Sequence, residues 1–279
     1  MWSVARPPHD AEAVFRKCIS RSLQPVRDQL LAAVPEVVKA ARDFEAAAST
    51  GTTHLLVEAD FRSRFAKDIE LKKTYKNRMV GATSPGRAIY DEIKDAIEFN
   101  ICPMCGHRPI AGLDHALPKE HFPLLAVTPS NLVPCCADCN HDKLESVAKR
   151  EEDVFLHPYF DDVDRDVWLV ADILESIPTG ATFNVAAPGH WSPVLAERVR
   201  HHFDELGLAN LYTAQAGSEI RALEPVMERA HGRNGSVGVR EELVDHREGR
   251  RRLHNNSWQG ALFDALILSD WYCSGGFRS

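Results

Sequence analysis

Hydrophobic side chains recur every three or four residues along much of the chain, the period of a helix that buries one face. Residues 10–50 follow this period, with Pro25 and Pro35 as interruptions. Residues 192–208 follow it as well, after a Ser-Pro pair that is typical of a helix start. The same pattern predicts further helices over 216–231 and 257–272.

Other segments depart from this period. "VWLVADIL" (167–174) and "ATFNVAA" (181–187) are rich in strand-forming residues around the turn "SIPTG", so they predict a hairpin. Ser84 and Pro85 predict the start of a helix, which continues directly into the first cysteine of the next segment. Glycines and dense charge over 232–256 predict a mobile connection.

These elements predict a mainly helical, α+β protein with three regions. They are a helical region (1–98), a short segment rich in Cys, Pro and Asn (99–150), and a region with a hairpin and helices (151–279).

Composition and charge limit the function classes. A content of 44% hydrophobic and 26% charged residues is typical of a soluble globular protein. The chain has no apolar run of about 20 residues and no signal-peptide pattern, so we expect a cytoplasmic protein. The net charge of -7 argues against promiscuous nucleic-acid binding, so any nucleic-acid function needs a local basic patch or a partner.

The cysteines are concentrated in the middle of the chain. Of seven, five lie within 102–139, an odd and clustered number that does not fit a disulfide framework. The pairs Cys102-x2-Cys105 and Cys136-x2-Cys139 have the spacing of two zinc knuckles, which predicts a structural Zn²⁺ site. Cys135 is the alternative to Cys136, and a redox dithiol is the alternative to the metal.

Oxygen and nitrogen donors lie between and beside the knuckles. Asp114 and His115 are adjacent, so they converge on one site only at a strand end or bulge. Asn131 and Asn140 add amide oxygens. Carboxylate and amide oxygens suit a hard cation such as Mg²⁺ better than a second zinc ion.

The order CxxC…DH…N…CxxCN…K, within "CPMCGHRPIAGLDHALPKEHF" and "NLVPCCADCNHDK", resembles the HNH (ββα-metal) endonucleases clamped by four cysteines. The resemblance implies a small nuclease core, with the Asp-His pair on a β-hairpin and the last metal ligand on a helix. It implies that His115 is the general base and that Asn131 orients it. Asp114 and Asn140 would hold a catalytic Mg²⁺ or Mn²⁺, with His141 as the alternative to Asn140.

These roles agree with the chemistry of phosphodiester hydrolysis. An imidazole near its ordinary pKa of about 6.5 can accept a proton from water at neutral pH, and a divalent cation can neutralise the charge that builds up on the phosphate. We expect phosphate contacts from Lys119, His121 and Lys143. A basic segment is either a second nucleic-acid contact or a solvated face, and its candidate residues are Arg62, Arg64, Lys72, Lys73 and Lys76.

The longer string "LDHALPKEHFPLLAVTPSNLVPCCADCN" is similar to HNH nucleases of bacterial anti-phage defence systems of the Septu type. That similarity implies a DNA substrate and a regulatory protein partner such as an ATPase. Two alternatives stay open: a nuclease that cuts RNA, such as tRNA, and a zinc-ribbon module that binds nucleic acid or protein without catalysis.

Overall fold

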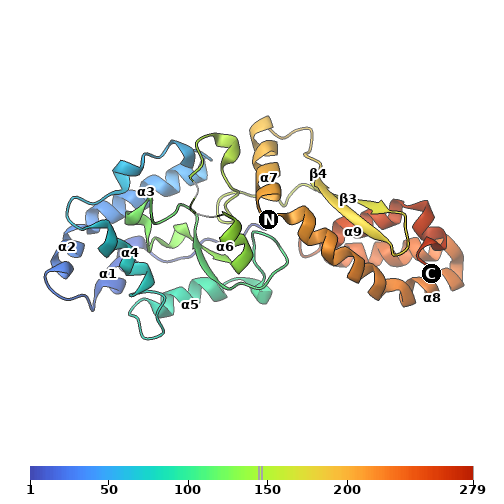
Figure 1. Ribbon diagram of the computed structural model, residues 1–279, viewed down its shortest axis with the longest axis horizontal. Coiled ribbons are helices and arrows are strands. Elements are labelled where there is room, and N and C mark those ends of the chain that lie inside the picture. The colour runs from blue at the N-terminus through green and yellow to red at the C-terminus, as the bar shows by residue number, and fades with distance from the viewer. Residues whose placement is uncertain (144, 146, 279) are drawn as a thin grey trace. The chain divides into compact units, whose positions relative to one another are not determined.

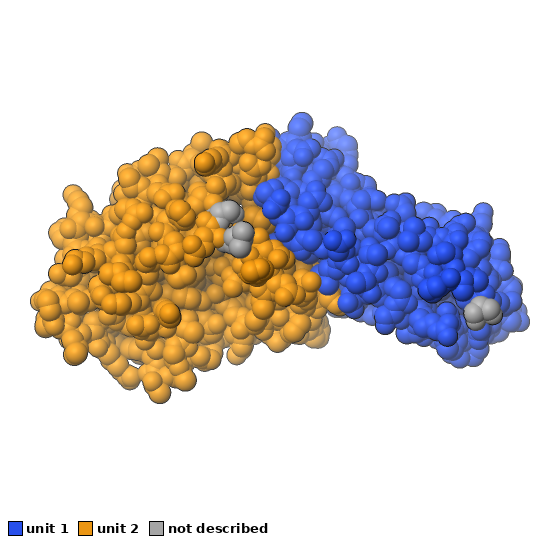
Figure 2. Space-filling view, viewed as in Figure 1, with its two compact units in different colours: residues 1–2, 162–279 blue, residues 3–161 orange. Residues whose placement is uncertain are grey.

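The computed structural model describes residues 1–143, 145 and 147–278, which form two compact units (Figures 1 and 2). One unit comprises residues 3–161, and the other comprises residues 1–2 with 162–279. A single hydrophobic core in the first unit includes residues from Val14 to Leu132. The helical region and the cysteine-rich segment therefore share one core, and the boundary between units falls after Asp161.

The helices of the first unit follow the hydrophobic pattern. Asp10 caps the first helix by accepting a hydrogen bond from the backbone N–H of Ala13 at 2.9 Å. Pro25 and Pro35 lie at helix starts, where a missing N–H costs nothing. The helices are α1 (Ala11–Ile19), α2 (Val26–Ala32), α3 (Val34–Ser49), α4 (Asp68–Lys76), α5 (Arg87–Asp95) and α6 (Ala137–Lys143).

Helix α5 starts later and ends earlier than the sequence predicted. The Ser84 hydroxyl donates to the Asn77 carbonyl at 3.0 Å and caps no helix; Gly86 takes the N-cap position instead. At the other end, Phe99 and Asn100 have positive φ angles of 59° and 55°, so the backbone there cannot continue a helix. The cysteine segment is thus entered through a sharp bend and not directly from a helix.

A short hairpin carries the Asp-His pair, as the sequence predicted. Strands β1 (Gly112–His115) and β2 (Leu132–Cys135) pair antiparallel, and α6 follows β2 directly (Figure 1). Asp114 lies opposite Val133, and His115 lies opposite Leu132 at the end of β1. This position at a strand end is the one that lets adjacent side chains approach one site.

The second unit packs a hairpin against helices. Strands β3 (Leu169–Leu174) and β4 (Gly180–Val185) form the predicted hairpin, with β3 contacting α9 (Trp258–Leu268) and β4 contacting α8 (Leu208–Arg251). Helix α7 (Pro193–Glu205) begins at the predicted Ser-Pro pair, where the Ser192 side chain accepts from the Leu195 N–H at 3.1 Å.

The expectation of a mobile connection over 232–256 is wrong. Helix α8 continues through this segment to Arg251, with one break at Asn234 and Gly235. Val239 and Leu243 are fully buried beyond the break. Burial of these side chains stabilises the helix, although the glycines nearby have a low helix propensity.

The coarse fold class is confirmed: the described chain is mainly helical and α+β, with two small antiparallel sheets. Among the described residues, no helix has both the length and the apolar character needed to cross a membrane.

Candidate metal centre and adjoining pocket

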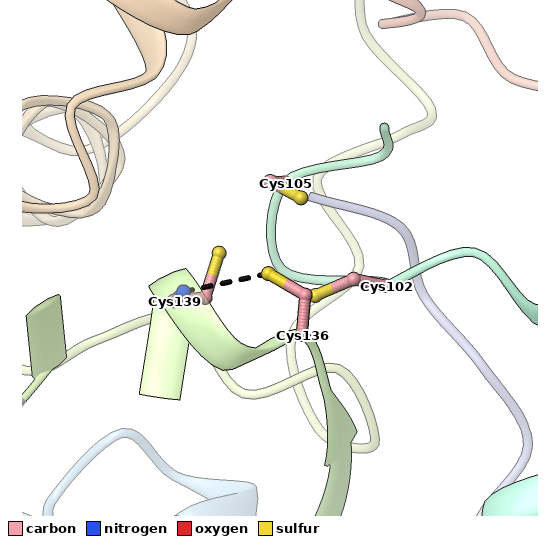
Figure 3. A group of neighbouring side chains, drawn as sticks. All are labelled: Cys102, Cys105, Cys136 and Cys139. Atoms are coloured by element: carbon pink, nitrogen blue, oxygen red, sulfur yellow. Dashed lines mark hydrogen bonds between the residues drawn. The ribbon is translucent and has the colours of Figure 1, made fainter. Parts of the chain in front are cut away.

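Four cysteines come together at the base of the hairpin (Figure 3). Their sulfur atoms all lie within 4.8 Å of one another and all four residues are buried: Cys102, Cys105, Cys136 and Cys139. Tetrahedral zinc with Zn–S bonds of about 2.3 Å places its sulfurs about 3.8 Å apart, so this cluster has the composition and the size for a metal such as zinc. Cys136, and not its neighbour Cys135, completes the cluster.

Each knuckle is held by its own backbone. The N–H of Arg108 donates to Cys105 Sγ at 3.5 Å, and the N–H of Cys139 donates to Cys136 Sγ at 3.4 Å (Figure 3). Such donors stabilise thiolates, the form that binds metal. Hydrogen bonds among the cysteines lower the pKa of Cys102 and Cys136 and raise the pKa of Cys105 and Cys139. Four cysteine sulfurs in one cluster fit a metal ligand set better than a redox dithiol, which needs only two.

A pocket of about 360 Å³ adjoins the hairpin. Asp114 and His115 line it from the end of β1, and Asn140 and His141 line it from α6. The remaining lining residues are Pro118, Lys119, Ala137 and Glu145. The structure thus brings together most of the residues that the sequence predicted for a second, catalytic metal.

His115 is buried and held in one orientation. Its Nε2 lies 2.9 Å from the carbonyl oxygen of Ala126, which can only accept, so Nε2 carries the proton and Nδ1 keeps its lone pair. The edge of the Tyr75 ring packs against the imidazole with ring centroids 4.4 Å apart. Burial lowers the pKa of His115 to about 3, so the expectation of an ordinary pKa near 6.5 is wrong and the ring is neutral at neutral pH.

The Lys143 side chain is buried and binds groups inside the protein. Its buried ammonium donates to the His115 carbonyl at 2.7 Å and lies 3.1 Å from Asp114 Oδ2. A buried cation requires such partners because it has lost its hydration. The side chain that we expected to contact phosphate is therefore an internal brace between α6 and the end of β1.

Asn131 holds the loop that follows the Asp-His pair. Its side-chain oxygen accepts from the Leu117 N–H at 2.7 Å, and its amide donates to the Leu117 and Leu125 carbonyls at 3.0 and 3.3 Å. The backbone carbonyl of Asn131 also accepts from the Ala116 N–H. The direct contacts that orient the imidazole come from Ala126 and Tyr75, and Asn131 shapes the loop around them.

The two candidates for the last metal ligand both remain in place. Asn140 and His141 are exposed on α6 and line the same pocket, so the choice between them stays open. Apart from the cysteines, no three His, Cys, Asp or Glu side chains in the described ranges lie as close together as a preformed metal cage requires.

Most cations of the basic segment have carboxylate partners. The pairs are Arg62 with Asp68, Arg64 with Glu36, Lys72 with Glu120 and Lys73 with Glu70. This pairing favours the solvated-face interpretation, because the acids cancel much of the positive potential. Lys76, near the end of α4, is exposed, and no carboxylate pairs with it among the described residues.

Two other predicted contacts lie near the pocket. The Lys119 ammonium is 6.0 Å from the centre of the Tyr75 ring and lines the pocket. The His121 ring donates from Nδ1 to the Glu58 carboxylate at 2.9 Å, so this nitrogen is already occupied by a partner within the protein.

Sequence patterns did not point to Tyr75 or Glu145 as residues of the site. The Tyr75 hydroxyl donates to the Leu113 carbonyl at 2.6 Å, so α4 supports β1 from a distant part of the chain. Only the folded chain places these residues at the site, because neither belongs to a motif with recognisable spacing.

No protein-family model and no solved structure matches the chain. Among curated proteins, protein ea31 of Escherichia phage lambda is 30% identical over 231 residues, which cover 79% of this chain and 78% of that protein. Similarity of this extent spans far more than the cysteine-rich segment. The chain belongs to the same family as protein ea31 of phage lambda.

Proposed function

We propose that the chain is an HNH endonuclease that hydrolyses DNA phosphodiester bonds with the help of a divalent cation. The observation that carries the proposal is one pocket lined by Asp114 and His115 from β1 and by Asn140 and His141 from α6, beside the four-cysteine cluster. Two elements far apart in sequence thus bring a base and hard-metal donors together.

The donor set fits a hard cation. Lys143 contacts one carboxylate oxygen of Asp114, and no hydrogen bond within the described chain is made to the other. Asp114 with Asn140 or His141 would hold Mg²⁺ or Mn²⁺, and Glu145 lines the same pocket. When bound, the cation would stabilise the negative charge that develops on the phosphate.

The protein side chains supply the remaining steps. The Nδ1 lone pair of His115 would take the proton from an attacking water, since Nε2–H is held by the Ala126 carbonyl. The low pKa of His115 keeps this lone pair free at neutral pH but makes it a weak base, so the proposal requires a cation that lowers the pKa of the attacking water. Lys119 lines the pocket and would contact the phosphate as a point charge. Lys143 does not have this role, because its ammonium is paired inside the protein.

Cleavage of plasmid and single-stranded DNA by the zinc-loaded protein, with added Mg²⁺ or Mn²⁺, tests the proposal. His115→Ala should reduce the rate by about a hundredfold or more, because general-base catalysis contributes at least that much. His190→Ala is the matched control. This exposed histidine lies in the second unit, where it forms a hydrogen bond with the Asp166 side chain, and the variant should cut normally. Equal cutting by the wild type and His115→Ala would contradict the assigned base.

A non-catalytic zinc-ribbon module is the second candidate. It is favoured by the Asp114 carboxylate already being paired with a buried ammonium and by the burial of His115. Zinc-loaded protein that binds DNA or RNA but cuts neither would support this alternative. Cutting of RNA alone would retain the nuclease and change its substrate.

The biological setting is part of the same proposal: a nuclease effector of anti-phage defence that works with a partner such as an ATPase. Support comes from the resemblance around the motif and from the net charge of -7, which gives the chain little attraction of its own for nucleic acid. Rapid cutting by the purified chain alone would contradict the need for a partner.

A further inference from the structure

An ion pair connects the two cysteine knuckles. Arg108 follows Cys105 by three residues, and Asp138 lies between Cys136 and Cys139. The guanidinium Nε of Arg108 is 2.7 Å from Asp138 Oδ2. Each partner belongs to a different knuckle, so the pair spans the cluster from one half of the ligand set to the other.

The Arg108 backbone is tied to the first knuckle as well. Its N–H donates to Cys105 Sγ at 3.5 Å, and its carbonyl accepts from the Cys102 N–H at 2.8 Å. The backbone from which the Arg108 side chain extends is therefore fixed by contacts with both cysteines of that knuckle. A change in the guanidinium should be transmitted to the sulfur atoms and not to a flexible loop.

Part of the guanidinium is buried without a hydrogen-bond partner. Arg108 Nη1 is shielded from solvent, and no acceptor for it exists among the described residues. A buried donor of this kind is costly unless charge nearby compensates for it. Four thiolates with one Zn²⁺ carry a net charge of about −2, which supplies that compensation.

We propose that Arg108 is a positioning residue of the zinc centre, which offsets the thiolate charge and, through Asp138, holds the two knuckles together against zinc loss. This role depends on zinc binding by the cysteines and does not depend on the nuclease activity.

Zinc release to an excess of a colorimetric chelator, measured on the full-length zinc-loaded protein, tests the role. Arg108→Gln should release zinc about tenfold faster, the lower end of the effect of losing an outer-shell partner. Arg108→Lys keeps the charge but lacks the planar fork, so an intermediate rate is expected. Arg150→Gln is the matched control, because Arg150 forms an exposed pair with Asp153 and should release zinc at the wild-type rate.

A spectroscopic measurement separates this role from a general loss of structure. In Co²⁺-substituted protein, loss of the guanidinium should move the thiolate-to-cobalt charge-transfer band to longer wavelength, because the thiolate electrons are then less stabilised. Arg150→Gln should leave the band unchanged. Release by Arg108→Gln within twofold of the wild type, with an unshifted band, would overturn the proposal. If Arg108→Gln does not fold, zinc release by Arg108→Lys at the wild-type rate would overturn it, because lysine cannot reproduce the planar fork that pairs with Asp138.

Discussion

Single residues around His115 are positioned by contacts that the spacing of the motif does not show. The imidazole is held by the Ala126 carbonyl and the Tyr75 ring, and the preceding carboxylate is held by Lys143. The His115 carbonyl is also bonded to Lys143, so one buried ammonium fixes both the backbone and the acid of the Asp-His pair. The site is therefore rigid at the end of β1, where a reacting group must be placed accurately.

Asn131 gives a test of this rigidity at the residue scale. Its fully buried amide satisfies the Leu117 N–H and the carbonyls of Leu117 and Leu125. Asn131→Ala leaves these groups unpaired in the interior, so we expect a loss of about 2–4 kcal/mol of unfolding free energy. Denaturant unfolding of the zinc-loaded protein measures it.

The matched control is Asn184→Ala, because Asn184 is exposed on β4 and its side chain donates to the exposed Asp172 carboxylate. That change should cost less than about 0.5 kcal/mol. Equal effects of the two substitutions would show that Asn131 is not a structural brace.

The limits of helices and strands were predictable where hydrophobic residues recur with a regular period. They were less predictable where a helix ends or is interrupted. The hairpin β3–β4 and helix α7 begin and end close to their predicted limits. The end of α5 and the continuity of α8 were not predicted. The region after α5 bends at residues with positive φ that carry no sequence signal, whereas α8 continues because its side chains are buried against other elements. Glycine content alone predicts a loop, whereas Val239 and Leu243 show that the segment is anchored.

The break inside α8 leads to a prediction at the scale of the element. Gly235 has φ +57° and ψ −143°, a conformation that favours glycine. Gly235→Ala should therefore destabilise the protein by about 1–3 kcal/mol through backbone strain. Thermal or denaturant unfolding provides the measurement.

Gly232→Ala, three residues earlier in the same helix, should have the opposite sign. Gly232 has no positive φ, and a Cβ there meets nothing within 4 Å. Alanine should stabilise the helix by about 0.5–1 kcal/mol. Destabilisation by both changes to the same extent would argue against strain at the break.

At the scale of the whole molecule, the cysteine cluster belongs to one unit only. All four ligands lie within residues 3–161, and the core of that unit joins the hairpin to α1, α3, α4 and α5. The second unit has its own core, built on α8, α9 and the β3–β4 hairpin. Metal loss should therefore affect the two units differently.

Removal of zinc with a chelator tests this difference by hydrogen exchange with mass spectrometry. Structural zinc contributes roughly 10 kcal/mol or more to folding in small zinc domains, so amide protection over residues 100–143 should fall strongly. Protection over 162–279 should stay the same, and added zinc should restore amide protection over residues 100–143. Equal loss in both units, or no loss in either, would contradict a structural metal in the first unit.

The features that could be predicted from the sequence depend on the chemistry of neighbouring residues. The CxxC pairs predict a metal because four soft ligands at that spacing have few other uses, and the cluster has formed from Cys102, Cys105, Cys136 and Cys139. The choice of Cys136 over Cys135 also follows from knuckle spacing. Contacts of Lys143 and the basic segment could not be read, because a charge in a sequence does not show which acid will fold against it.

The sequence by itself determined most of the helical and hairpin pattern and the four cysteines that cluster, since each depends on spacing within a few residues. The strand that carries the Asp-His pair was expected only from the resemblance to the HNH nucleases. Only the tertiary structure decided the buried state of His115, the bracing role of Lys143 and Asn131, and the contribution of Tyr75 from α4. These depend on desolvation and on partners tens of residues away, and such effects arise only when the chain closes around its core.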